Sequence, residues 1–276
     1  MTALLRLPLL GLAALWMLAA PAAADLAKAR ALIELVRLDA AIARFEAEGR
    51  RGLAAQTATL PDPAAAALTG LWSTHFAAED LMEDLGVLLA EDLPDATLDA
   101  LLTLYDAPEA RRITEIEAAA QQDAVAHDRD AEAAALLARM QAEDDPRLPL
   151  LARLTEATDA VDVSVTIGLN ATYAMSAAMM GSPTFPQVLS DEELLAMIGG
   201  FEPRMRAEAE RAIAATSAWT YRALSEAELT AYAEMIEGAA PRAFYAAVNR
   251  ALETLLVDRS RRFGAAAMEA TGARDI

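Results

Sequence analysis

Two histidines with carboxylates at helical spacing are the residues best suited to metal chemistry in this chain. His75 stands four residues before Glu79, and Asp123 stands four residues before His127. Side chains four residues apart share one face of a helix, and imidazole with carboxylate is a common ligand set for zinc. These two pairs are the candidate metal sites. The alternative is a solvated or capping histidine, because carboxylates are frequent enough here to fall beside a histidine by chance.

The segment 76–106 carries many carboxylates and no basic residue. Such a segment could bind calcium or a basic partner. A calcium loop, however, needs ligands at alternating positions of an irregular loop with a glycine at its turn. The acids of this segment instead interleave with leucines at helical spacing, which is typical of a solvated helix face.

Several catalytic signatures are missing. The chain has no cysteine, which excludes thiol nucleophiles, thiolate metal sites and disulfides. It has no Gly-x-Ser-x-Gly elbow, glycine-rich phosphate loop or His-Glu-x-x-His helix. Its formal net charge of -19 repels phosphate backbones, so no nucleic-acid partner is expected. We expect no cofactor and no enzymatic activity, with a metal-dependent hydrolase as the alternative.

The first 24 residues predict a cleaved signal peptide. Arg6 supplies a positive charge, the run 7–18 is apolar, and small residues precede the predicted cleavage between Ala24 and Asp25. The apolar run is too short for a comfortable membrane span, and no cysteine follows it to carry a lipid. We therefore expect a periplasmic or secreted protein with no stable membrane span after cleavage.

The elements that would position these residues are all helical. In the first half we expect a helix over 26–48 ended by Gly49, an interruption at Thr57–Pro63, and one helix from about Glu109 to Ala142. Between them, two apolar stripes predict further helices: Leu81, Met82, Leu85, Leu88 and Leu89, then Leu98, Leu101, Leu102 and Tyr105.

The second half has clearer helix starts. An apolar segment at 148–154 is followed by the uncharged stretch 163–189, which we expect to be a buried helix ending in a loop. Ser190 with Glu193, and Ser225 with Glu228, have the form of capping boxes. The last helix is expected to carry an apolar stripe from Phe244 to Phe263 and to end after Gly264.

The two halves are similar to each other. The stripe 98–105 superposes on 229–236, with Arg111 on Arg242, and the short match of 35–38 with 151–154 suggests a second alignment. We therefore predict an all-α fold of two similar antiparallel helical bundles from a tandem duplication, repeat 1 over 25–145 and repeat 2 over 146–276. The alternative is that both halves are merely amphipathic.

The repeated segment resembles a known family. An apolar stripe that ends in Tyr105, followed by Pro108 and Arg111, is similar to the core of the domain of unknown function 2059 family of exported bacterial proteins. The second copy has the start Ser225 to Glu228 and carries Arg242. The family-like cores are about 93–140 and about 224–265. The resemblance implies an all-helical fold and an exported location, and it brings no known activity, substrate or catalytic residue.

The residues of this motif also have a structural interpretation. A proline in the first turn of a helix tolerates its missing donor, and an arginine that follows can reach the unpaired carbonyls of the preceding helix. The motif therefore predicts a corner between two helices. We interpret Tyr105, Pro108, Arg111, Arg242 and Phe244 as structural residues, because stripes at helical spacing are usually core.

These observations predict an exported protein that binds a protein or peptide partner of the bacterial envelope through its helical surface. The first alternative is a metal-dependent binder or hydrolase that uses His75 with Glu79, or His127 with Asp123. The second is binding of a lipid or a membrane surface through an apolar groove between the halves, although the net charge opposes anionic lipid. The sequence leaves the oligomeric state open.

Overall fold

The computed structural model describes residues 25–58, 62–127, 129–180 and 189–270, and all regular structure in these ranges is helical, which confirms the all-α prediction. The predicted signal peptide, residues 1–24, lies outside the described residues. The helices are residues 25–35, α2 (Leu38–Thr57), α3 (Asp62–His75), α4 (Ala78–Asp92), α5 (Asp95–Asp106), α6 (Pro108–Ala126), α7 (Asp130–Ala142), α8 (Leu148–Ala157), α9 (Ala160–Met179), α10 (Asp191–Gly199), α11 (Glu202–Thr220), α12 (Glu226–Ile236) and α13 (Ala239–Ala270).

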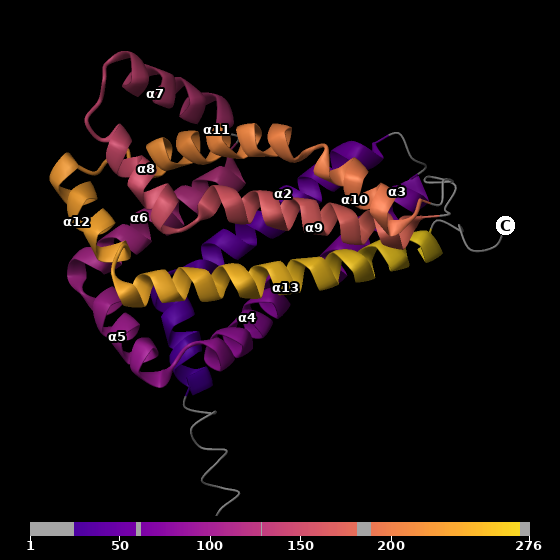
Figure 1. Ribbon diagram of the computed structural model, residues 1–276, viewed down its shortest axis with the longest axis horizontal. Coiled ribbons are helices and arrows are strands. Elements are labelled where there is room, and N and C mark those ends of the chain that lie inside the picture. The colour runs from indigo at the N-terminus through magenta and orange to yellow at the C-terminus, as the bar shows by residue number, and fades with distance from the viewer. Residues whose placement is uncertain (1–24, 59–61, 128, 181–188, 271–276) are drawn as a thin grey trace, which may run out of the picture.

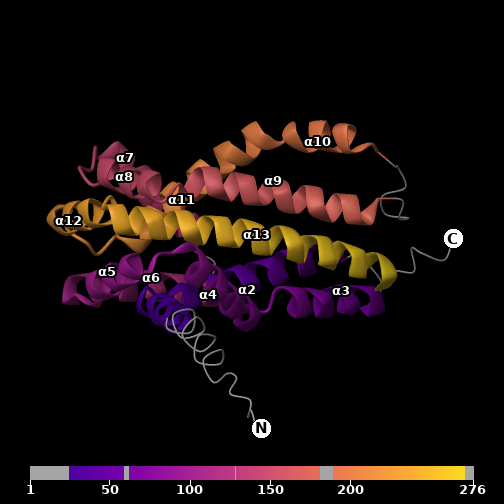
Figure 2. The same ribbon diagram turned by 60° about the horizontal axis from the view of Figure 1, so that its bottom comes forward.

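The longest helix, α13, organises the fold. It crosses the molecule beside α9 in Figure 1, and Figure 2 shows it between α9 on one side and the helices of the first half on the other. It contacts α3, α4 and α5 as well as α9. Among the described residues, no helix combines the length and the apolar character needed to cross a bilayer.

Three apolar cores each combine residues from both halves of the chain. The largest packs residues 25–35, α4 and α5 against Phe244 and its neighbours on α13. The second joins Ile113 and Met140 to leucines of α8 and α12. The third joins Phe76 to Phe263. The two halves therefore share their cores.

The predicted apolar stripes of the first half are confirmed. Leu81, Leu85 and Leu89 are the buried leucines of α4, and Leu98, Leu101 and Tyr105 are the buried positions of α5. Their spacing of three or four residues places them on one side of each helix, which faces the core. The acidic residues Glu79, Asp80, Glu83 and Asp84 are exposed, so the interpretation of a solvated face also holds for α4.

The helix predicted over 26–48 is interrupted. Residues 36 and 37 form a turn, Arg37 has a left-handed φ of 57°, and α2 begins at Leu38. The guanidinium of Arg37 pairs with Asp39 and with Glu115 of α6, which stabilises the turn against that helix. The prediction was wrong because these tertiary contacts offset the roughly 1–2 kcal/mol that a left-handed conformation costs a non-glycine residue.

Gly49 was predicted to end a helix, but it lies inside α2. The Trp72 indole of α3 packs against it so closely that a Cβ atom at this position would overlap the ring. The same indole donates from Nε1 to the carbonyl oxygen of Glu46 at 3.1 Å. The glycine therefore permits close approach of α3 to α2.

Two further boundaries differ from the prediction. The helix expected from Glu109 to Ala142 is two helices, α6 and α7, because His127 has an extended backbone (φ -138°, ψ 140°). The last helix continues past Gly264 to Ala270. Gly264 is a buried residue inside α13, so it contributes to packing and does not mark the end of the helix.

The two capping boxes are confirmed, and the one that starts α12 is reinforced from another helix. Ser225 Oγ accepts from the Glu228 backbone N–H at 3.3 Å, and the Glu228 carboxylate accepts from the Ser225 N–H at 2.8 Å. Arg112 of α6 also pairs with Glu228. Hydrogen bonds from Ser225 and then from Arg112 lower the pKa of Glu228 to about 2.

We expect Ser225→Ala to lower the free energy of unfolding by about 1 kcal/mol, because the backbone N–H of Glu228 loses its acceptor. Urea unfolding at pH 7 measures the loss. The control is Ser73→Ala, an exposed position in the last turn of α3, where the change should stay within about 0.5 kcal/mol. Equal effects at the two positions would contradict the capping role of Ser225.

Candidate functional site

The candidate metal ligands His75 and Glu79 do not share a helix. His75 is the last residue of α3, Glu79 lies in the first turn of α4, and residues 76 and 77 separate the two helices. Burial, Arg262 and Arg259 lower the pKa of His75, and the guanidinium of Arg259 donates to the His75 carbonyl oxygen at 2.9 Å. The predicted common helix face was wrong here, and two arginines beside the ring disfavour a metal cation.

The second pair forms a local contact at the end of α6. His127 Nδ1 lies 3.0 Å from Asp123 Oδ1, and Arg129 Nε donates to the other oxygen of Asp123 at 3.1 Å. The hydrogen bond from Arg129 is the main cause of the lowered pKa of Asp123. Across the described ranges, no group of three or more histidine, aspartate or glutamate residues is placed to hold a metal ion. Asp123 is thus a partner of Arg129 at a helix end.

The corner residues take the positions that the sequence predicts. Pro108 is in the first turn of α6, and Arg111 Nε reaches back to the Asp106 carbonyl oxygen at 3.2 Å. Tyr105 and Phe244 are each 1% exposed, and their ring centroids are 6.2 Å apart. Arg242 is exposed in the first turn of α13. Tyr105 has a second role, because its hydroxyl reaches a cavity that the sequence did not reveal.

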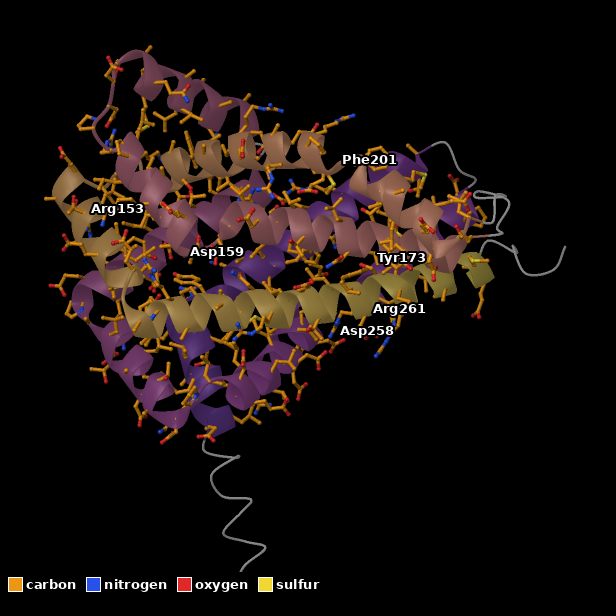
Figure 3. The ribbon with its side chains drawn as sticks, in the orientation of Figure 1. Arg153, Asp159, Tyr173, Phe201, Asp258 and Arg261 are labelled. Carbon is orange, nitrogen blue, oxygen red and sulfur yellow. The ribbon has the colours of Figure 1, made fainter. Side chains whose placement is uncertain are left out.

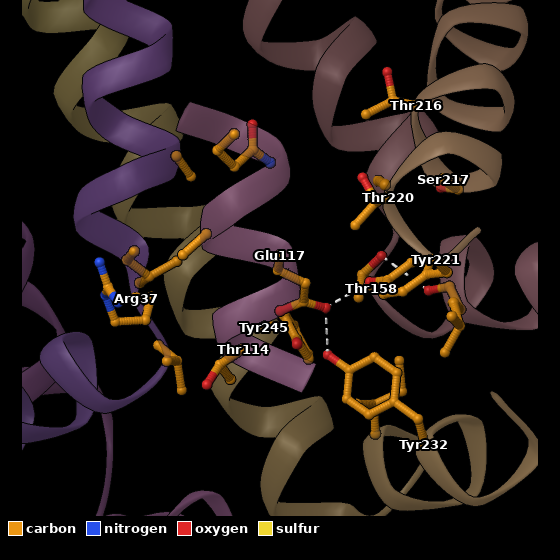
Figure 4. A pocket seen from close by; sticks show the side chains of 18 of the residues that line it. Arg37, Thr114, Glu117, Thr158, Thr216, Ser217, Thr220, Tyr221, Tyr232 and Tyr245 are labelled. Carbon is orange, nitrogen blue, oxygen red and sulfur yellow. Dashed lines mark hydrogen bonds between the residues drawn. The ribbon is translucent and has the colours of Figure 1, made fainter. Parts of the chain in front are cut away.

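A cavity of about 410 Å³ lies where the two halves meet. Its walls come from the start of α2 and the turn before it, the end of α5, α6, α8, the start of α9, α11, α12 and α13 (Figure 4). Polar and apolar side chains both line the cavity: Val36, Arg37, Leu38, Ala41, Tyr105, Thr114, Glu117, Ala118, Gln121, Leu154, Thr155, Thr158, Ala160, Ile213, Thr216, Ser217, Thr220, Tyr221, Tyr232, Ile236, Phe244 and Tyr245.

The polar centre of this cavity is Glu117 of α6. Its Oε1 accepts a hydrogen bond from Tyr221 Oη at 2.5 Å and another from Tyr232 Oη at 2.7 Å (Figure 4). The hydroxyls of Tyr105 and Tyr245 lie 3.3 Å apart in the same cavity. Four of the five tyrosines of the chain thus surround one carboxylate.

Ion pairs fix both ends of α12, the helix that carries Tyr232. Arg112 pairs with Glu228 at the start of α12, and Arg153 binds Glu237 just after its end through two hydrogen bonds of 2.9 and 2.8 Å. Tyr232 lies between these two contacts, so the ion pairs position its hydroxyl. Tyr221 caps the end of α11, and its backbone N–H donates to the Ser217 carbonyl at 3.0 Å.

Burial raises the pKa of the Glu117 carboxyl, and the hydrogen bonds from Tyr221 and Tyr232 oppose part of that rise. Burial also raises the pKa of Tyr221 and Tyr232, so both hydroxyls stay protonated and able to donate at neutral pH. No described residue forms an ion pair with Glu117. Arg37 lines the cavity as well, but its guanidinium is paired with Asp39 and Glu115.

This arrangement is suited to holding a ligand. The hydroxyls of Thr114 and Thr158 donate to carbonyls of their own helices, at 3.0 and 3.1 Å. None of the lining residues is a histidine or a cysteine, and no lining serine or threonine hydroxyl is hydrogen-bonded to Glu117, which accepts only from tyrosines. What the cavity presents is one carboxylate, several aromatic rings and an apolar wall.

A second cavity is almost wholly apolar. It measures about 240 Å³ and lies between α2, α3, α9 and α13, with Phe45, Trp72, Phe76 and Phe263 among its walls. The Trp72 and Phe76 rings stack with centroids 4.1 Å apart. The lipid alternative would use an apolar cavity of this kind. The aromatic residues of its walls also belong to the third core, so close packing of Trp72 against Gly49 is a second explanation for the cavity.

Sequence reasoning missed Glu117 and its tyrosines. Glu117 is four residues after Ile113 and three after Thr114, both buried, so it lies on the buried face of α6. An acid on an apolar face was the available signal. The partners Tyr221 and Tyr232 are more than 100 positions away in the chain, and no spacing rule connects them to Glu117.

Comparison with known proteins adds no assignment: no family model matches the chain, and neither a curated protein nor a solved structure matches it.

Proposed function

We propose that this chain is an exported, non-catalytic protein of the bacterial envelope that binds a small organic molecule in the Glu117 cavity. The observation that carries the proposal is a half-buried carboxylate, its pKa raised by desolvation, that faces a cavity and has no cationic partner among the described residues. Buried charges are normally paired, so an unpaired one at a cavity wall indicates a place for a ligand group.

The size and walls of the cavity support this function. A volume of about 410 Å³ falls within the usual range of roughly 300–1,000 Å³ for small-molecule sites. Such sites combine apolar and aromatic walls with a few placed polar groups, and here Phe244, Leu154 and Ile236 accompany Glu117 and the tyrosine hydroxyls.

A tandem duplication would explain where the cavity lies, and we propose it as well. What supports it is the repeated order of elements: residues 25–35 and α2 to α6 correspond to α8 and α9 to α13, with α7 between them. The first junction of each set holds a left-handed residue, Arg37 (φ 57°) and Asp159 (φ 51°), and Figure 3 labels Asp159 just before α9.

The contacts repeat too. α2 packs against α3, α4 and α6, as α9 packs against α10, α11 and α13. This correspondence differs from the sequence match of 35–38 with 151–154, because the first segment spans a junction and the second lies inside α8. Residues flanking both left-handed junctions line the cavity, so a ligand would lie between the repeats.

The test uses one substitution that fills part of the cavity and a matched control substitution on the exposed side of the same helix. Ala118 is buried in its wall, whereas the next residue of α6, Ala119, is exposed. We expect phenol, indole, 2-phenylethanol or phenethylamine to raise the unfolding midpoint of the wild-type protein and of Ala119→Met, and to lose this effect in Ala118→Met. A ligand at 100 times its Kd stabilises the native state by about 2.7 kcal/mol, which is readily measured.

Equal shifts in Ala118→Met and in the wild type would place the binding elsewhere. If none of the four compounds stabilises the wild type, at concentrations up to their solubility, the cavity is not a small-molecule site and the proposal is wrong.

A protein or peptide partner is the second candidate. It is favoured by exposed apolar side chains around α10: Leu195 is 56% exposed and Phe201 50% exposed, and Figure 3 places Phe201 where α10 meets α11. Crosslinking in the envelope should yield adducts that disappear in Leu195→Ser and Phe201→Ser but persist in Ala118→Met. Adducts lost only in Ala118→Met would instead connect partner binding to the cavity.

A further inference from the structure

The cavity also indicates the chemical class of its ligand. Building on the proposed function, we propose that the ligand is an organic cation, an amine or a quaternary ammonium on an apolar body, with its charge beside Glu117 and its body against the tyrosine rings. The argument uses the charge balance of the cavity, the free oxygen of the carboxylate and the aromatic walls.

The charge balance of the cavity is negative. Glu117 and Arg37 are its charged lining residues, and Arg37 is already shared between two carboxylates, Asp39 and Glu115. Arg37 therefore adds no net positive charge to the cavity. Placing a cation beside Glu117 would pair a desolvated charge, whereas placing an anion there would add a second unpaired one. The net charge of -19 favours the approach of cations from solution as well.

The carboxylate has one oxygen left for a ligand. Both tyrosine hydroxyls bind Oε1, and no described group donates to Oε2. Oε2 is not among the buried atoms that lack a partner, so it is open to the cavity. An ammonium N–H can donate to Oε2 without displacing either tyrosine, and a quaternary ammonium can lie against it by charge alone.

The walls around that oxygen are aromatic. The ring centroids of Tyr221 and Tyr232 are 6.0 Å apart, and the planes of the two rings are tilted by 53°. The ring centroids of Tyr245 and Phe244 are 5.4 Å apart. Cations are attracted to the faces of such rings by the ring quadrupole, and more strongly where water is excluded. A carboxylate surrounded by tyrosines thus favours an organic cation over a neutral molecule of the same shape.

The test uses probes that have similar apolar bodies and differ in charge. Phenethylamine is compared with 2-phenylethanol and 3-phenylpropionate, and choline with its uncharged isostere 3,3-dimethylbutan-1-ol. We expect at least one cation of the two series to bind ten times more tightly than its neutral counterpart, measured by calorimetry at pH 8. In Glu117→Gln the difference between cation and isostere should disappear. The control, Glu109→Gln, changes an exposed acid on the same helix that does not line the cavity, and it should keep the preference.

A second readout needs no variant, so it survives if Glu117→Gln folds poorly. Cation affinity should rise with pH through the raised pKa of Glu117 and then level off, because a bound cation favours the ionised carboxylate. The other titratable groups that face Glu117 are Tyr105, Tyr221, Tyr232 and Tyr245, which stay neutral in this range, and Arg37 in the wall stays charged.

Two failures are distinguishable. If the alcohols bind in the cavity as tightly as the cations, and Ala118→Met abolishes that binding, the site exists but its ligand is not a cation. If no probe distinguishes the wild type from Ala118→Met, the proposed function itself fails. Tighter binding of 3-phenylpropionate than of phenethylamine would also overturn the inference.

Discussion

Phe244→Ala is expected to lower the free energy of unfolding by about 3–5 kcal/mol, the usual cost of removing a buried phenylalanine ring. Phe244 is 1% exposed, belongs to the largest core and touches the rings of both Tyr105 and Tyr245. It joins α13 to α5, so its loss leaves a void between the two halves. Urea unfolding followed by circular dichroism gives the number.

The matched control for this change is Phe201→Ala, because Phe201 is 50% exposed between α10 and α11. There we expect a change within about 0.5 kcal/mol. A loss below about 1 kcal/mol at Phe244, or an equal loss at Phe201, would show that the shared core does not hold the halves together as described.

Glu117→Gln is expected to remove a pH dependence of stability. Burial raises the pKa of Glu117 in the folded protein above the ordinary value of 4.5 that it regains on unfolding. Below pH 4.5 the group is protonated in both states. As the pH rises from there through the folded pKa, the unfolded chain releases its proton first, so wild-type stability falls, by at most about 1.4 kcal/mol per pH unit.

The glutamine variant keeps an oxygen that can accept from Tyr221 and Tyr232 but cannot ionise. The measurement is the difference in unfolding free energy between wild type and Glu117→Gln, from pH 4 to pH 8. With rising pH, the unfolding free energy of Glu117→Gln should increase relative to that of the wild type. The difference should then stay constant once the Glu117 carboxyl is ionised in both states. Glu109→Gln, at an exposed position of α6, is the control for the other titrating acids. Parallel curves for wild type and Glu117→Gln would contradict the raised pKa of Glu117.

Short-range patterns determined much of the architecture of this chain. The leucine stripes of α4 and α5, the capping boxes at Ser190 and Ser225, and the Pro108 corner all appear where residue spacing placed them. Each depends on interactions within a few residues: a helical period, a side chain that caps its own backbone, or a proline without a donor. Such features are readable from one sequence because both partners lie in the same short segment.

The tertiary structure decided the features that join distant segments. Arg37 breaks a helix where its guanidinium meets Glu115, and Gly49 lies mid-helix to admit Trp72. Local patterns predicted a different structure at both positions. The strongest case is Glu117, whose two hydrogen-bond donors come from the end of α11 and the middle of α12, more than 100 residues later. No spacing rule relates these residues, because only the packing of α6 against α11 and α12 brings them within hydrogen-bonding distance. The sequence by itself thus determined the helices, and their packing decided the site.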